Sequence, residues 1–292
     1  MNIDEFIDSS QDRIKNTISH LFNFSNKKVK SLNEAALYIL NTGKKIRPIL
    51  VLAIVQSFHQ NIEKALIPAC ALELVHSYSL VHDDLPCMDN DDYRRGKPTV
   101  HKKYSEWLAL LTGDFLLTHA FSSISSSTLL SDREKVLLIK YLSKKASANG
   151  MIGGQVVDLE STNKTINFET LYYMHSKKTS ALFETAAIFG AIICKTNFAD
   201  TKNLLHFAKN IGLAFQFADD VLDRTSPCNV LGKKNSSDQK NKKTTAINVL
   251  GFEKAKTYAK KYYQKAIKSL DNLSVQSDLL KDLTDRLIQR KF

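Results

Sequence analysis

The chain has 292 residues, 43% of them hydrophobic, which is enough to bury the core of one large domain. Only 10 glycines and 5 prolines are present, too few to punctuate a many-stranded β protein, so helices are favoured throughout. The formal net charge of +11 is compatible with three kinds of partner: nucleic acid, an anionic membrane surface or an anionic small substrate.

The distribution of charged and apolar residues narrows these classes. The lysines are scattered, with one concentration within 233–243 and no interleaved aromatic residues, so we expect no nucleic-acid partner. The four cysteines lack C-x-x-C spacing and indicate reduced thiols. The acidic N-terminus does not resemble a signal peptide, and no uncharged apolar run reaches the ~18–20 residues of a membrane span. We expect one domain, residues 1–292, in the cytoplasm.

The first two helices are predicted from periodicity and capping. Residues 2–24 place Ile and Phe side chains near one stripe, which indicates an amphipathic helix. The order Ser31-x-x-Glu34 is typical of a capping box, so a second helix is expected to begin at Ser31 and to run through Leu40.

The turn that follows collects positive charge. Gly43 can end one helix, and Pro48 suits the first turn of the next. Lys44, Lys45 and Arg47 therefore lie at a helix N-terminus, where free backbone N–H groups and the helix dipole already favour an anion. The pattern predicts an anion site, although a basic turn between helices is the simpler alternative.

A long helix is expected over 62–84. His76, Ser79 and Asp83 are separated by three and four residues and so share one stripe. Pro86 disfavours helical geometry at the residue before it, which places Asp83 at the helix C-terminus. A carboxylate there is disfavoured by roughly 0.3–1 kcal/mol because the dipole is negative at that end.

The acidic segment continues beyond this helix. Five carboxylates lie within 83–92, and Arg94 and Arg95 follow at once. A hard divalent cation with oxygen ligands, Mg²⁺ above all, would offset the repulsion. The two arginines offer planar donor pairs suited to phosphate oxygens. The segment therefore predicts a metal-chelated polyphosphate ligand, with a solvated acidic loop as the alternative.

Further helices are expected at 104–125, 132–150 and 171–194. Gly153-Gly154-Gln155, with Asp158 nearby, permits a close helix approach. Lys177-Lys178-Thr179 interrupts an otherwise apolar helix, where cations are expensive unless paired. Thr179 could bond back to a preceding carbonyl and bend this helix.

A second acidic cluster follows the uncharged run 212–218. Asp219 and Asp223 share a helix face, which costs roughly 0.2–0.5 kcal/mol as a like-charge pair. Two acidic clusters whose carboxylates repel one another are not needed to keep the chain soluble, which favours a functional role for them. A break at 226–229 and a Lys-rich loop to Lys243 come next, and two amphipathic helices complete the chain.

Together these motifs resemble the trans-isoprenyl diphosphate synthase family, most closely its bacterial farnesyl diphosphate synthases. The similarity covers nearly the whole chain. The motifs that carry it are Asp-Asp-x-x-x-x-Asp at 83–89 with Arg94-Arg95-Gly96, Asp-Asp-x-x-Asp at 219–223 after Phe215-Gln216, Gly43-Lys44-x-x-Arg47-Pro48, Gly-Gly-Gln at 153–155 and Lys178-Thr179.

The resemblance implies an all-α, single-domain, isoprenoid-synthase-type bundle around a deep central cavity, usually a homodimer. The acidic clusters would face each other across the cavity mouth. The implied reaction is a Mg²⁺-dependent, head-to-tail condensation of isopentenyl diphosphate with dimethylallyl or geranyl diphosphate, giving farnesyl diphosphate and pyrophosphate. About three Mg²⁺ ions would serve each active site once diphosphate is bound.

Site residues are carried over position by position. The metal ligands implied are Asp83, Asp89 and Asp219, supported by Asp84 and Asp223. The positions implied for the allylic diphosphate are Arg94, Lys178, Thr179, Gln216, Lys233 and Lys243, and those for isopentenyl diphosphate are Lys44, Arg47, His76 and Arg95. The catalytic set comprises Asp83, Asp84, Asp89, Arg94, Lys178 and Asp219.

Product length is expected to depend on packing beneath Asp83. In bacterial enzymes of this type an aromatic residue at the position of Tyr78, with the two-residue insertion around Pro86-Cys87, accompanies a C15 product. On a helical wheel Ser79 lies more directly under Asp83, so both residues remain candidates. Geranyl and geranylgeranyl diphosphate are the alternative products.

Two residues depart from the pattern that is usual in the family. Lys45 stands where the family more often has Arg, which predicts weaker isopentenyl diphosphate binding; Lys177 stands where relatives often have His. The basic end, 290–292, could close over bound diphosphate or fray.

A terpene cyclase would hold one diphosphate rather than two. A non-catalytic subunit of a heteromeric prenyl synthase would typically lack one of the motif residues, and none is missing here.

Overall fold

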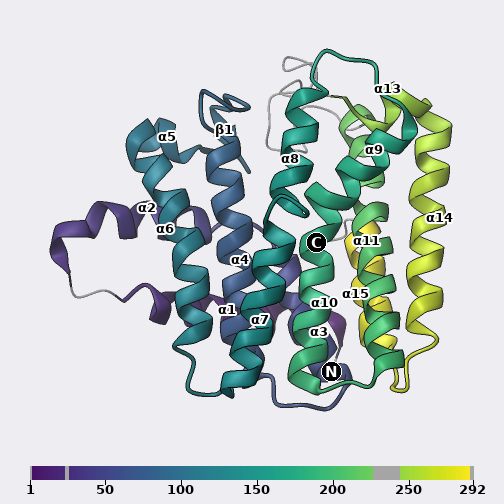
Figure 1. Ribbon diagram of the computed structural model, residues 1–292, viewed down its shortest axis with the longest axis horizontal. Helices are drawn as coiled ribbons and strands as arrows, with labels where there is room; N and C mark the ends of the chain where they lie inside the picture. The colour runs from purple at the N-terminus through teal and green to yellow at the C-terminus, as the bar shows by residue number, and fades with distance from the viewer. Residues whose placement is uncertain (1, 24–25, 226–243, 290–292) are drawn as a thin grey trace.

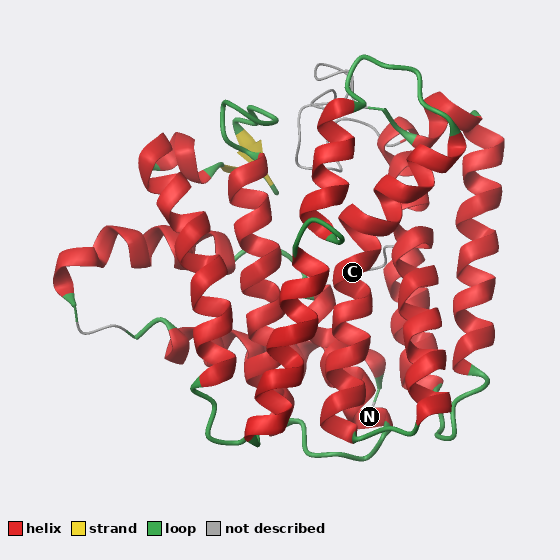
Figure 2. Ribbon diagram, in the orientation of Figure 1, coloured by secondary structure: helices red, strands yellow, loops and turns green. Residues whose placement is uncertain are grey.

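The computed structural model describes residues 2–23, 26–225 and 244–289. Within these ranges the chain is almost entirely helical, and a two-stranded hairpin stands at one end of a helical bundle (Figures 1 and 2). The all-α prediction is confirmed.

The elements follow one another through short connections. The N-terminal half comprises α1 Ile3–Leu21, α2 Lys30–Leu40, α3 Ile46–Ser57, α4 Glu63–Asp83, β1 Tyr93–Arg94, β2 Lys97–Pro98, α5 Val100–Lys103, α6 Glu106–Ser125 and α7 Asp132–Ala146. The C-terminal half comprises α8 Met151–Glu160, α9 Phe168–Met174, a π-helix His175–Ser180, α10 Ala181–Cys194, α11 Phe198–Thr225, α13 Ala246–Leu250, α14 Phe252–Leu270 and α15 Asp278–Gln289.

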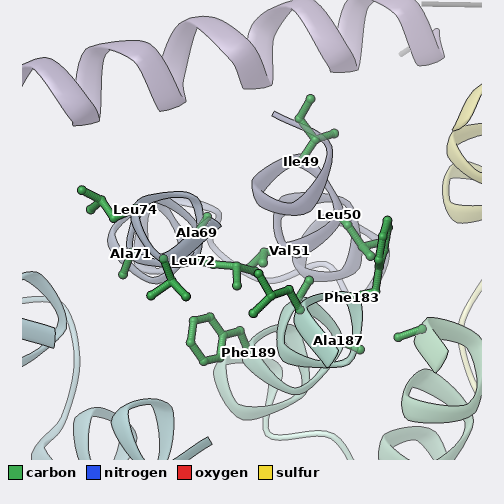
Figure 3. Close-up of a cluster of buried hydrophobic side chains, with 14 of the residues drawn as sticks. Ile49, Leu50, Val51, Ala69, Ala71, Leu72, Leu74, Phe183, Ala187 and Phe189 are labelled. Atoms are coloured by element: carbon green, nitrogen blue, oxygen red, sulfur yellow. The ribbon is translucent and has the colours of Figure 1, made fainter. Parts of the chain in front are cut away.

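The centre of the bundle is formed by α3, α4 and α10. Nine of the 12 residues of α3 are buried, as expected for a helix that is apolar on all sides. Figure 3 shows Val51 of α3 close to Leu72 of α4 and Phe189 of α10. At Gly190 of α10 a Cβ would lie 2.5 Å from a methyl group of Ile54, so the glycine is what lets these two helices approach.

Two helices, α4 and α6, are long and apolar enough to cross a membrane by length and composition alone. Within the bundle, 72% of the apolar window of α4 and 44% of that of α6 are buried. The two pack together at Gly113, where a Cβ would lie 2.0 Å from Nε2 of His82. Core helices of bundle proteins share these properties, so they do not define a span.

The predicted starts of α1 and α3 are confirmed, whereas α1 ends at Leu21 rather than at residue 24 and α7 ends at Ala146 rather than at residue 150. Asn2 caps α1 in a capping box with Glu5. Gly43 has a φ of +82°, and Pro48 lies in the first turn of α3. The prediction for Ser31 is wrong: a 3₁₀ turn leads directly into α2, which begins one residue earlier and has no side-chain cap.

Candidate active site

Both acidic motifs lie at one end of the bundle. Helix α4 ends at Asp83, beside the hairpin β1–β2, and α11 carries Asp219 towards the same end, which is the upper end in Figure 1. Asp220 accepts a hydrogen bond from the backbone N–H of Ala246, the first residue of α13, at 2.6 Å. The fold therefore directs two motifs that are more than 100 positions apart in the sequence to the same end of the bundle.

The loop after α4 folds back on the helix end. The backbone N–H of Asp89 donates to the carbonyl of Asp83 at 2.9 Å, and that of Asn90 donates to Leu85 at 3.1 Å. The helix ends where Pro86 requires it to. The loop thereby returns the backbone of Asp89 to the end of α4, next to that of Asp83.

Asp84 points into the protein and holds Arg94. Asp84 is 1% exposed, and Nε of Arg94 donates to both of its carboxylate oxygens, at 2.7 and 2.9 Å. Burial lowers the pKa of Arg94, but the hydrogen bond and charge of Asp84 outweigh burial and raise that pKa above its usual value. The pair anchors strand β1 to the end of α4.

Next to Arg94, Arg95 lies against the predicted anion site. Its guanidinium packs directly on Gly43, where an added Cβ would lie 1.9 Å from Nη1. The same Nη1 donates to the hydroxyl of Thr42 at 3.3 Å. Any side chain larger than glycine would displace Arg95, so Gly43 serves both the turn and the placement of the cation.

Arg47 completes this group of cations, and the uncharged His76 lies close to both arginines. The guanidinium of Arg47 lies 5.0 Å from the centre of the Phe183 ring, and its buried Nε has no hydrogen-bond partner among the described residues. Burial, with Arg95 also acting, lowers the pKa of Arg47 to about 10. Burial, with Arg47 and Arg95 also acting, lowers the pKa of His76 well below 6.5. Burial and mutual repulsion both disfavour positive charge at this place, so a bound anion would stabilise the two arginines.

Lys45 is not part of the anion-facing surface. Its backbone is left-handed, with a φ of 53°, and its ammonium donates to the carbonyl of Thr42 at 2.7 Å and to Glu73 at 3.0 Å. Both side chains of the Lys45–Glu73 pair are largely buried. The prediction that Lys45 weakens isopentenyl diphosphate binding by losing a bidentate contact therefore has no basis in its position.

On the other side of the site, the predicted bend is a π-helix over His175–Ser180. Thr179 donates to Oε1 of Gln216 at 2.7 Å, so the expected bond back to a preceding carbonyl is wrong. Lys178 is paired with the buried Asp158 of α8 at 2.5 Å. π-helices are rare and often occur at functional sites.

Gln216 links this π-helix to the second acidic motif. Its amide donates to Asp220 at 2.9 Å. Burial, with neighbouring Asp219 and Asp223 also acting, raises the pKa of Asp220 to about 7. Buried His175, 3.6 Å from Asp220, has a pKa lowered to about 3, chiefly by burial. Asp220 thus fixes α11, the π-helix and α13 relative to one another.

Tyr78 precedes Asp83 by five residues on α4 and is 5% exposed. Burial, together with the charge of Asp83, raises the pKa of its hydroxyl to about 12, and this hydroxyl has no partner in the described part of the chain. Ser79 donates to the carbonyl of His76 at 2.9 Å. Of the two residues proposed to limit product length, Tyr78 has the larger side chain and Ser79 the smaller.

Some expectations lie outside the described residues: the helix break at 226–229, Lys233, Lys243 and the tail 290–292. Conversely, sequence reasoning missed Glu73, although a buried Glu inside an apolar helix signals a partner. It also missed Asp220 as an anchor and Asp84 as the partner of Arg94.

The residues present fit Mg²⁺ and diphosphate. Within the described ranges, no three His, Cys, Asp or Glu side chains are grouped closely enough to hold a metal ion by themselves. Mg²⁺ is commonly bound by one or two carboxylates together with substrate phosphates, and Asp83 and Asp89 provide such a pair. The unpartnered Nε of buried Arg47 is a donor that a diphosphate oxygen would satisfy.

An all-α bundle with paired aspartate motifs and a separate group of cations defines a class of enzymes that act on diphosphates. The family model "Polyprenyl synthetase" matches residues 29–283, and the chain belongs to this family. It is a prenyltransferase.

Relatives and a solved structure agree with this assignment. The chain is 40% identical to farnesyl diphosphate synthase of Bacillus subtilis, covering 89% of each chain. It is 42% identical to the chloroplastic geranylgeranyl pyrophosphate synthase of Capsicum annuum, over 82% of this chain and 66% of the relative. The geranyltransferase of Helicobacter pylori, complexed with magnesium and isoprenyl diphosphate, superposes with a TM-score of 0.83 at 32% identity, covering 98% of this chain and 97% of the other.

Proposed function

We propose that this prenyltransferase condenses isopentenyl diphosphate with dimethylallyl and then geranyl diphosphate, using Mg²⁺, and releases farnesyl diphosphate and pyrophosphate. The observation that carries the proposal is the group of cations around Gly43, which is distinct from the pair of aspartate motifs. Arg95 lies on Gly43, and Arg47 presents a buried, unpartnered donor. Two anion-binding regions suit two diphosphate substrates.

Each region has its own task. Asp83, Asp89 and Asp219 hold Mg²⁺, with Asp84 and Asp223 in support and about three ions per site. When bound, Mg²⁺ supplies positive charge to the diphosphate leaving group. Lys178, Thr179 and Gln216 orient that diphosphate from the π-helix side, and Arg94 does so from the hairpin. Lys44, Arg47, His76 and Arg95 hold isopentenyl diphosphate.

The reaction needs no protein nucleophile. The allylic C–O bond breaks with its electron pair going to the diphosphate, the isopentenyl double bond attacks the allylic cation, and a proton is lost to the departing diphosphate. The protein must exclude water, which would capture the cation. The apolar lining expected of the central cavity serves this purpose.

Geranyl and geranylgeranyl diphosphate are the alternative products, and one similar relative is a geranylgeranyl pyrophosphate synthase. Incubating the protein with dimethylallyl and isopentenyl diphosphates, with Mg²⁺ or with EDTA, and resolving products by length distinguishes them. We expect C15 product only with metal. Asp83→Asn and Asp219→Asn should each lower kcat by about 100-fold or more. Turnover that survives EDTA, or a C20 product, would contradict the proposal.

The proposed assembly is a homodimer acting in the cytoplasm. Trp107, Leu110 and Leu111 of α6 form an exposed apolar stripe, with exposed fractions of 63%, 48% and 48%. An apolar stripe of this kind is typical of a subunit interface. Light scattering should give twice the chain mass, and Leu111→Glu should give a monomer. Cell fractionation tests the location.

A further inference from the structure

We propose that Glu73 is a positioning residue for the isopentenyl diphosphate site: through Lys45 it fixes the turn from which Lys44 and Arg47 reach the substrate. The inference rests on the proposed function, because it assigns a role towards one of its two substrates. Glu73 belongs to none of the motifs considered above.

The contacts run from the core to the turn. Glu73 is 2% exposed on α4, three residues before His76. Its carboxylate binds the ammonium of Lys45 at 3.0 Å, and the same ammonium binds the carbonyl of Thr42 at 2.7 Å. One lysine therefore ties α4 to the residue before Gly43.

The turn needs a stabilising contact because its backbone adopts left-handed conformations. Gly43 and Lys45 both have positive φ, of 82° and 53°, and the second is uncommon for a residue with a Cβ. Local strain of this kind persists only where surrounding contacts hold it. The bond from Lys45 to Glu73 is such a contact, and in the sequence Lys45 stands between the cationic residues Lys44 and Arg47.

Glu73 also acts through its charge. It raises the pKa of Arg47 and of Arg95, while burial lowers both. A carboxylate nevertheless repels a diphosphate. If its charge were the whole role, removing it would tighten substrate binding; if it positions the turn, removing it loosens binding. The sign of the change in KM separates the two roles.

The test measures steady-state kinetics of Glu73→Gln with each substrate varied in turn. We expect the KM for isopentenyl diphosphate to rise about tenfold, while the KM for the allylic diphosphate and kcat change less than about threefold. Lys45→Met should have a similar effect. The double variant should be no worse than the poorer single variant, because both changes break one contact.

Glu134→Gln is the matched control. Glu134 is also a buried glutamate, 5% exposed, paired with a lysine of α4, Lys64, at 2.9 Å. It lies on α7, and Gln also suits its place in a capping box. We expect this variant to lose stability without a selective change in KM.

The outcomes are distinct. A lowered KM for isopentenyl diphosphate, an equal rise for both substrates, additive effects in the double variant, or the same change in Glu134→Gln would each overturn the positioning role. Failure of the unmutated protein to consume isopentenyl diphosphate with Mg²⁺ would instead overturn the proposed function.

Discussion

Asp84 and Arg94 face each other in a buried pair in which one guanidinium Nε reaches both carboxylate oxygens, at 2.7 and 2.9 Å. Strand β1 is thereby fixed to the end of α4, and Arg95, the next residue, reaches Gly43. The pair links the first acidic motif to the group of cations. This contact is one of two ties between α4 and the group of cations, the other being the bond from Lys45 to Glu73.

Asp84→Asn should lower the free energy of unfolding by about 3 kcal/mol, because it removes the hydrogen-bonded counter-charge of a buried guanidinium and leaves it the more distant Asp91, at 3.7 Å. Denaturant unfolding at pH 7.5 measures the loss. Asp92→Asn is the control, since Asp92 pairs with Lys102 at the surface and its side chain is 62% exposed. Equal stability changes in the two variants would show that the Asp84 pair is no stronger than a surface contact.

Gly154→Ala should disturb the π-helix. A Cβ at Gly154 would lie 2.2 Å from the backbone nitrogen of Lys178, and a backbone atom cannot rotate away. We expect kcat/KM for the allylic diphosphate to fall at least about tenfold, with a stability loss of about 1–3 kcal/mol. Val156→Ala, an exposed change on the same helix, should alter neither quantity. Normal kinetics in Gly154→Ala would mean that Lys178 needs no fixed place.

Much of the helical order could be predicted because apolar periodicity and helix breakers act locally. Pro86 and Gly43 end their helices for reasons visible in a few residues. The cap at Ser31 failed because a 3₁₀ turn supplied the helix start instead. The π-helix was anticipated only as a bend, since its geometry depends on contacts with Gly154 and Gln216 from two other helices.

The site was predicted as a set of motifs, and its internal contacts were not. Glu73 and Lys45 are 28 positions apart, and nothing local pairs them. Asp84 looked like a neighbour of the metal ligands, yet its side chain turns inward to Arg94. Helix periodicity gives the face on which a residue lies, but the partner of a buried charge depends on tertiary packing.

Tyr78→Ala should lengthen the product beyond C15. The buried ring packs edge-on against His82, with centroids 5.8 Å apart, and is close enough to Asp83 to feel its charge, so its loss leaves a cavity near the first acidic motif. If the product grows past this position, as the family resemblance implies, the cavity admits a longer chain. Chromatography of the dephosphorylated products measures chain length. Ser79→Ala removes only a hydroxyl and should leave the product at C15. An unchanged C15 product from Tyr78→Ala would reject this role for the ring.

His76 should make the ligand-free protein sensitive to mild acid. Its pKa in the folded state lies well below 6.5, chiefly because of burial and then because Arg47 and Arg95 are near. The unfolded chain therefore binds a proton at pH values where the folded protein does not. Above about pH 6.5 the titration of His76 costs the folded protein no stability. Below that pH it lowers the free energy of unfolding by up to about 1.4 kcal/mol per pH unit.

His76→Gln removes this titration and keeps a hydrogen-bonding side chain. Between pH 7.5 and 5.5, in urea unfolding without ligand, the unmutated protein should lose about 1.4 kcal/mol more stability than the variant. A bound diphosphate stabilises the protonated imidazole, so adding inorganic diphosphate at pH 5.5 should reduce the difference. Parallel stability curves for the two proteins would show that His76 keeps an ordinary pKa in the fold, and the group of cations around it would then be less enclosed than its contacts indicate.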